Sequence, residues 1–123
     1  MLVIRDEQLR AFADGVRHGW VEERLSIHFP AYFDALPAPE RARFVAEMSR
    51  RAARLGFTSD HEVYLFTTLG LVLGRDFDSD PKLTWVAPIL NDTQGKPPRE
   101  KIEALYAEAV RHLGTTRGDS GDA

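Results

Sequence analysis

Apolar residues recur at intervals of three and four along most of this chain, the spacing that places them on one face of an α-helix. The pattern is clearest in residues 4–29, 40–55 and 98–113, and it returns in a shorter segment at 81–90. Residues 60–73 are apolar on every side, which is typical of a helix at the centre of a core. No strand-like alternation stands out, so the sequence predicts an all-α fold, a compact single-domain bundle of about five helices.

The same spacing predicts which residues face the core. In the first predicted helix these are Leu9, Phe12, Ala13, Val16 and Trp20. In the second they are Phe44, Val45, Met48, Ala52 and Leu55, and in the last they are Ile102, Leu105, Tyr106, Ala109 and Leu113. In the apolar segment, Gly70 would let a neighbouring helix pack closely. That segment has more apolar surface than a small bundle easily covers, and we expect part of it to face a partner.

Helix ends are marked by capping residues. Ser59 and Glu62 have the spacing of a capping box, which predicts a helix that begins at about Asp60. Gly56 and Gly74 follow predicted helices and are natural C-cap residues. These signals predict short connections between the helices.

Length and composition fit one globular domain. The chain has 123 residues, and we expect a helical domain at residues 1–114 followed by a disordered polar tail at 115–123. The absence of cysteine excludes disulfides and thiolate chemistry. The longest apolar run, at residues 63–73, is too short for a membrane span, which needs about 20 residues, and the N-terminal run is too short for a signal peptide. We therefore expect a cytoplasmic protein without a membrane partner.

The stretch DFDSDP at residues 76–81 has carboxylates at alternating positions, like the start of an EF-hand calcium loop. That loop needs glycine at its sixth position and a bidentate acid at its twelfth. Here the sixth residue is Pro81 and the twelfth is Ala87, which has no side-chain oxygen. The sequence therefore argues against a metal ion, and we expect no cofactor.

The same stretch is better explained as an irregular acidic elbow between two helices. Asp80 followed by Pro81 fits the N-cap and first position of the helix predicted at 81–90. Asp78 is expected to accept hydrogen bonds from loop amides, as in Asx-turns, and Phe77 to turn inward as an anchor. A carboxylate patch that receives a basic partner is the alternative that the residues leave open.

Another candidate for a metal site is a stripe on the first predicted helix. Asp14, His18 and Glu22 are spaced by four, which places them on one face. Because this face is opposite the predicted core face, we expect the stripe to be solvated. No HExxH, GxSxG or phosphate-loop motif is present, and the polar residues are expected on outer faces rather than in a shared pocket. We therefore predict that the protein is not an enzyme.

Charge is unevenly distributed along the chain. Residues 41–54 carry five arginines and one glutamate, a net charge of +4, whereas residues 58–80 carry five acids and one arginine, a net charge of −4. On the face opposite the predicted core lie Arg43, Arg50 and Arg54. The planar guanidinium suits carboxylate and phosphate recognition. Three interpretations of this face are open. It is an ordinary solvated surface in which Glu47 pairs with a neighbouring arginine, or it binds a protein, or it binds nucleic acid.

Four strings in the chain carry a resemblance: IRDEQL at 4–9, FTSD at 57–60, LGRDFDSDPKLTW at 73–85 and ILN at 89–91. Together they resemble a group of small uncharacterised proteobacterial proteins associated with type VI secretion and polymorphic-toxin gene neighbourhoods. Members of this group often have a cysteine in the central helix, which this chain lacks. The resemblance implies no catalytic residue. It implies an adaptor or chaperone that loads a secreted effector, or an immunity protein that blocks one.

We therefore predict a non-enzymatic protein-interaction module, an accessory or immunity protein for a secreted bacterial effector or a secretion spike component. The residues expected to bind this partner are Arg43, Arg50, Arg54, Asp76 and Asp78. The alternative is a small nucleic-acid or anion-binding protein that uses the same three arginines. The net charge of −3 counts against nucleic acid.

Overall fold

The computed structural model describes the backbone of residues 6–92 and 95–121 and the side chains of residues 15–92 and 95–113. The described residues contain helices and no strand, so the fold is all-α, as the sequence predicts. In chain order the elements are α1 (Asp6–His28), α2 (Pro30–Phe33), α3 (Ala38–Arg54), α4 (Asp60–Leu73), the 3-10 turn η1 (Phe77–Ser79), α5 (Val86–Leu90) and α6 (Pro98–Gly121).

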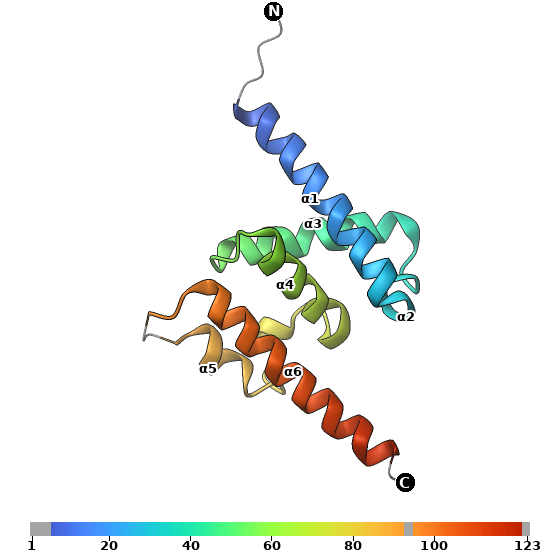
Figure 1. Cartoon of the computed structure of the whole chain (residues 1–123), viewed down its shortest axis with the longest axis vertical. Helices are drawn as coiled ribbons and strands as arrows, with labels where there is room; N and C mark the ends of the chain where they lie inside the picture. The colour runs from blue at the N-terminus through green and yellow to red at the C-terminus, as the bar shows by residue number, and fades with distance from the viewer. Residues whose placement is uncertain (1–5, 93–94, 122–123) are drawn as a thin grey trace, which may run out of the picture.

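α4 is the central helix. It contacts α1, α2, α3, η1 and α6, and Figure 1 shows it between α3 on one side and α6 on the other. This position accounts for its lack of a polar face. Its two buried threonines are satisfied within the helix, because Thr67 donates its hydroxyl to the Val63 carbonyl at 2.7 Å and Thr68 donates to the Tyr64 carbonyl at 2.8 Å.

The ends of α4 are set by the predicted residues. The Ser59 hydroxyl accepts a hydrogen bond from the Glu62 amide at 3.1 Å, and the Glu62 carboxylate accepts one from the Ser59 amide at 3.3 Å. This confirms the capping box. Gly74 follows the helix with a φ of +119°, and Gly56 follows α3 with a φ of +92°. Both values are in the region that favours glycine.

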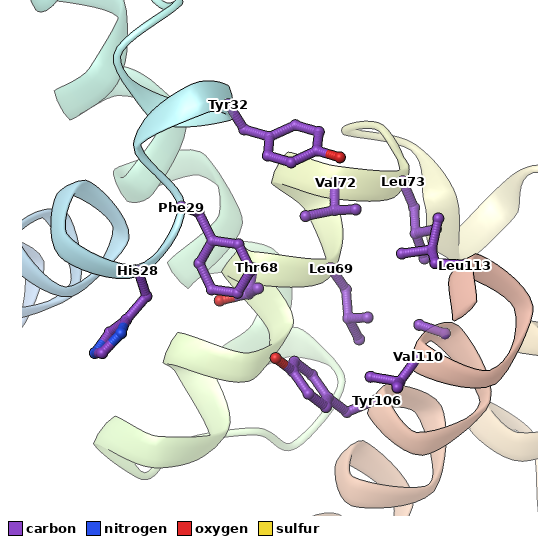
Figure 2. Close-up of a pocket in the computed structure, with 11 residues that line it drawn as sticks. His28, Phe29, Tyr32, Thr68, Leu69, Val72, Leu73, Tyr106, Val110 and Leu113 are labelled. Carbon is purple, nitrogen blue, oxygen red and sulfur yellow. The ribbon is translucent and has the colours of Figure 1, made fainter. Parts of the chain in front are cut away.

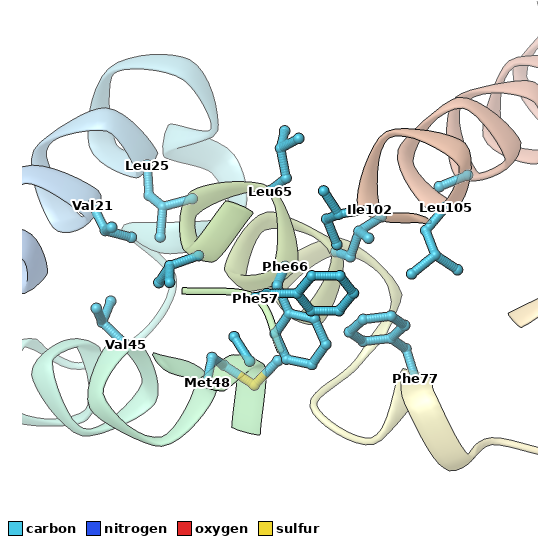
Figure 3. Close-up of a cluster of buried hydrophobic side chains, with 14 of the residues drawn as sticks. Val21, Leu25, Val45, Met48, Phe57, Leu65, Phe66, Phe77, Ile102 and Leu105 are labelled. Atoms are coloured by element: carbon cyan, nitrogen blue, oxygen red, sulfur yellow. The ribbon is translucent and has the colours of Figure 1, made fainter. Parts of the chain in front are cut away.

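A row of three phenylalanines joins separate segments in the core (Figure 3). Phe66 of α4 lies between Phe57, from the α3–α4 connection, and Phe77 of η1, with ring centroids 5.9 Å and 5.1 Å away. All three side chains are buried. The inward orientation of Phe77 confirms that it anchors the elbow.

α3 and α4 pack closely where Gly70 faces Met48. A Cβ built at position 70 would overlap the Met48 methyl group and lie 3.1 Å from its sulfur. Met48 is fully buried, so its side chain has little room to move aside. The predicted close approach at Gly70 is therefore confirmed.

Replacing Gly70 with alanine is expected to destabilise the protein by about 1–2 kcal/mol. Overpacking a core costs about 1–3 kcal/mol, and the better helix propensity of alanine offsets up to about 1 kcal/mol of this. The free energy of unfolding in urea measures the change. In a Met48→Ala background the same replacement is expected to be neutral or stabilising, and equal destabilisation in both backgrounds would show that the contact is not responsible.

The buried face of α1 differs from the predicted one. Val21 and Leu25 are fully buried, whereas Val16 is 59% exposed. Figure 1 shows the reason, because the first half of α1 projects beyond the other helices and only its later turns reach them. Val21 and Leu25 lie on a different side of α1 from Val16, so the apolar period predicted neither the buried face nor the length of helix that is covered. Three further predicted core residues of α1 lie outside the side chains described: Leu9, Phe12 and Ala13.

Two leucines on other helices are also more exposed than predicted. Leu55 is the C-cap residue of α3 and is 41% exposed, and Leu113 of α6 is 36% exposed. Both follow the helical period of their neighbours, but the core ends before it reaches them. The adjacent Phe57 fills the position below the end of α3 and is fully buried.

The helix predicted at 81–90 is shorter than expected. α5 begins only at Val86, and residues 81–85 form turns. The Asp80 carboxylate accepts a hydrogen bond from the Lys82 amide at 2.9 Å, an Asx-turn in place of the predicted helix N-cap. The prediction was wrong because an aspartate before a proline suits both motifs.

α6 continues to Gly121, past the end predicted at Gly114. A glycine inside a helix costs only about 1 kcal/mol relative to alanine, so it does not by itself end one. The disordered tail expected at 115–123 concerns residues whose side chains are not described, and it stays a prediction.

Candidate functional site

Arg51 of α3 holds the acidic elbow against the body. Its Nη2 atom lies 2.7 Å from an oxygen of Asp78 and 3.2 Å from an oxygen of Asp76, and its Nη1 donates to the backbone carbonyl of Arg75. The side chains of Arg51 and Asp78 are only 17% and 18% exposed. Asp78 thus accepts from a guanidinium rather than from the loop amides that the sequence predicts. Asp76, at 83%, presents its carboxylate to solvent.

A second ion pair joins the same two segments. Arg75 lies 3.5 Å from the Glu47 carboxylate, and its guanidinium lies 5.6 Å from the centre of the Phe44 ring. Glu47 therefore pairs with Arg75, next to the elbow. The solvated interpretation had predicted a pair with an arginine of its own helix. The reason is tertiary, because the elbow returns along α3 and brings Arg75 to it.

The remaining acids between residues 58 and 80 also have partners. Asp60 forms an ion pair with Arg17 of α1 at 2.6 Å. Glu62 belongs to the capping box and Asp80 to the Asx-turn. All five acids of this part of the chain thus have a hydrogen bond or an ion pair to other groups of the protein.

The five arginines of α3 are divided between two roles. Arg51 binds the elbow, and Arg41 donates to the backbone carbonyls of Leu36 at 2.8 Å and Asp34 at 3.1 Å. The other three are exposed and have no hydrogen bond or ion pair to any described residue. We call them the arginine stripe: Arg43, Arg50 and Arg54.

The stripe on α1 is only partly described, so its expected solvation stays a prediction. No group of three His, Asp, Glu or Cys residues in the described part of the chain has a suitable arrangement for a metal ion. His18 and Glu22 are partly buried, and Asp14 lies outside the side chains described.

An open groove of about 470 Å³ runs along α4 on the side away from Gly70 and Met48. Figure 2 shows how three segments enclose it. We call it the α4 groove. One wall comes from the α1–α2 corner, with His28, Phe29 and Tyr32, and the floor comes from α4, with Thr68, Leu69, Val72 and Leu73. The opposite wall comes from α6, with Tyr106, Ala109, Val110 and Leu113.

The lining of the α4 groove is mainly apolar. Tyr32 and Val110, on opposite walls, are 48% and 56% exposed, although both carry large apolar groups. Among the described lining residues, the only polar side-chain groups are three hydroxyls and the His28 imidazole, and none is a carboxylate or a lysine. The groove can therefore accept an apolar surface, but it offers no carboxylate for general acid-base chemistry.

Tyr64 lies beside the groove on α4. Burial raises the pKa of its phenol above the usual 10.0, Tyr106 adds to the rise, and the hydrogen bond with Thr68 and the charge of Arg24 oppose it. Its ring meets Trp20 of α1 edge to face, with centroids 5.7 Å apart. Tyr64 is thus a neutral packing residue near pH 7.

Comparison with known proteins found no matching family model, no matching curated protein and no matching solved structure. None of the helices in the described residues is both long enough and apolar enough to cross a membrane. Function is therefore inferred from the α4 groove, the arginine stripe and the resemblance stated above.

Sequence reasoning identified the exposed arginines and missed the rest of this arrangement. The apolar character of residues 60–73 indicated an uncovered side of α4, but nothing in the local pattern indicated which side. Arg51 was left out of the outward-facing arginines but was given no role, although its position between Met48 and Ala52 on the helix face placed it near the core edge. The groove walls come from segments far apart in the chain, and no local signal could have found them.

Proposed function

We propose that this chain is a non-enzymatic protein-interaction module that receives an amphipathic helix of a partner protein in the α4 groove. The observation that carries the proposal is an apolar groove of about 470 Å³ over the central helix of the fold. Exposed apolar surface of this kind, gathered in one place, marks interaction sites in folded proteins.

A helix is the occupant that this geometry favours. The floor of the groove is a helix and both walls are helical, so a bound helix would take the place of a missing neighbour of α4. Helices bound in this way insert apolar anchors at positions i, i+3, i+4 and i+7. The described lining residues include no carboxylate or lysine, which matches an apolar face, and the polar face of the bound helix would remain in solvent.

The resemblance to secretion-associated proteins supports a secreted effector or a spike component as the source of the helix. An adaptor or chaperone would cover an apolar helix of the effector before export, and an immunity protein would block it. Both roles require binding without chemistry, and the cytoplasm is the compartment in which both would act.

Replacing Val110 with glutamate is expected to abolish this binding. The change places a carboxylate on an exposed position of one groove wall, and an apolar helix could dock only by burying an unpaired charge. Because Val110 is 56% exposed, the folded state should tolerate the change. The protein is co-expressed with each effector whose gene neighbours its own. The mass of the purified complex in solution then shows whether the two proteins bind.

Val16→Glu is the matched control. Val16 is the same residue type, is 59% exposed and lies on α1 outside the groove. A complex that survives Val16→Glu and is lost with Val110→Glu supports the proposal. The proposal is contradicted if the complex still forms with Val110→Glu. It is also contradicted if none of these effectors forms a complex with the unmodified chain.

A further inference from the structure

The acids at residues 58–80 and the arginines of α3 differ in how many of them have a partner within the fold. Every acid between residues 58 and 80 is engaged within the fold, whereas the three arginines of the stripe have no partner among the described residues. The acids are therefore held by contacts within the fold, whereas the arginines leave unpaired positive charge on the surface of α3.

The contact with the elbow also makes the stripe more basic. Glu47 lies on the same helix face as the arginine stripe and is the one carboxylate between Arg43 and Arg54. The fold brings Arg75 to Glu47 at 3.5 Å, which neutralises this carboxylate from outside the helix. Between Arg43 and Arg54 no unpaired acid is then left to balance the stripe, and Glu40 lies one turn before it.

The stripe is unfavourable for the helix in isolation. Arg50 and Arg54 are one turn apart, and like charges at this spacing destabilise a helix. Glu40, in the first turn of α3, forms no ion pair with Arg43 in the structure. A surface that repels itself in the free protein gains from a ligand of opposite charge.

We infer that the arginine stripe is a second binding surface, which takes an acidic segment of a protein partner. This inference rests on the proposed function only in assuming that the chain binds a protein. The guanidinium forks would bind carboxylates, each by paired hydrogen bonds. Residues 43 to 54 span about 16 Å of helix, at 1.5 Å per residue, so a helix with carboxylates at i, i+7 and i+11 matches the stripe in length and spacing.

A protein segment fits this surface better than nucleic acid. Three arginines can neutralise about three phosphates, whereas proteins that bind duplex DNA through its backbone make about 6–10 such contacts. The protein carries a net charge of −3, which opposes approach to a polyanion at long range. A short acidic segment needs only the local positive field of the stripe.

The test uses a helical peptide with glutamate at i, i+7 and i+11 in an alanine-rich background, titrated into the full chain at low salt. The variant Arg50→Glu/Arg54→Glu is expected to bind it about tenfold more weakly, because two attractive contacts become repulsive. The control variant Lys82→Glu/Arg99→Glu changes net charge equally at exposed positions away from the stripe. It is expected to keep the affinity of the unmodified chain within about twofold.

Four outcomes would overturn the inference. These are no binding of the peptide, equal weakening by both double variants, tighter binding of a 20-base-pair duplex than of the peptide, and loss of helicity in Arg50→Glu/Arg54→Glu. The last would show that the arginines are structural. A second peptide has glutamine in place of glutamate. Its affinity for the unmodified chain should be no higher than the affinity of the glutamate peptide for Arg50→Glu/Arg54→Glu. A higher affinity of the glutamine peptide would also count against the inference.

The groove and the stripe are tested by different variants. If Val110→Glu abolishes the effector complex and the stripe variants bind the acidic peptide normally, the inference fails and the proposed function stands. If the peptide depends on the stripe and no effector complex forms, the proposed function fails as stated and the stripe remains an anion-recognition surface.

Discussion

Arg51→Ala is expected to lower the free energy of unfolding by about 2–3 kcal/mol. Removing the guanidinium leaves the largely buried Asp78 carboxylate and the Arg75 carbonyl without their donor. Breaking a fully buried ion pair costs about 3–5 kcal/mol. The expected loss is smaller here because the Asp76 contact is largely exposed and contributes little. Urea denaturation followed by circular dichroism measures the change.

Arg50→Ala is the internal control for this prediction. Arg50 precedes Arg51 in the chain, is exposed and has no partner among the described residues, so its removal should change stability by no more than about 0.5 kcal/mol. Arg51→Lys should fall between the two, because an ammonium keeps the charge and loses the fork. Equal effects of Arg50→Ala and Arg51→Ala would contradict the role assigned to Arg51.

Phe77→Ala is expected to destabilise the protein by about 3–5 kcal/mol, the range for removing a buried phenylalanine. Its ring is 1% exposed and packs against Phe66 with centroids 5.1 Å apart. A loss of this size is a large part of the total stability of a typical domain, which is about 5–15 kcal/mol. Thermal unfolding of the variant should therefore begin at markedly lower temperature.

Tyr32→Ala is the matched comparison for Phe77→Ala. It removes an aromatic ring of similar size, but Tyr32 is 48% exposed and lies on a groove wall, so we expect it to destabilise the fold by less than about 1 kcal/mol. If Phe77→Ala unfolded as readily as the unmodified chain, the elbow would not be anchored by this ring.

The features that the sequence predicts correctly depend on residues close together in the chain. The capping box needs only Ser59 and Glu62, three positions apart, and the exposure of the arginine stripe follows from the helical period around Phe44 and Met48. The inward turn of Phe77 follows from one large apolar residue among carboxylates. In each case the interaction is local, or the burial preference of a single side chain decides it.

The features that the sequence does not predict depend on contacts between distant residues. Arg51 reaches carboxylates 25 and 27 positions later, and the helical period that separates it from Arg50 does not indicate which group it binds. Val16 follows the apolar period of α1, yet no other element covers it. The α4 groove exists because α1, α2 and α6 stop short of covering one side of α4.

The sequence by itself determined that this protein is helical, where its central helix begins and ends, and that three arginines of α3 face outward. These properties follow from periodicity and capping, which act within a few residues. Only the tertiary structure decided that Arg51 of α3 binds the acidic elbow, that Glu47 pairs with Arg75 rather than with an arginine of its own helix, and that α4 is left open along a groove. The reason is physical, because which charges meet and which apolar faces stay uncovered depend on how whole helices pack, and that packing brings together residues that no local pattern relates.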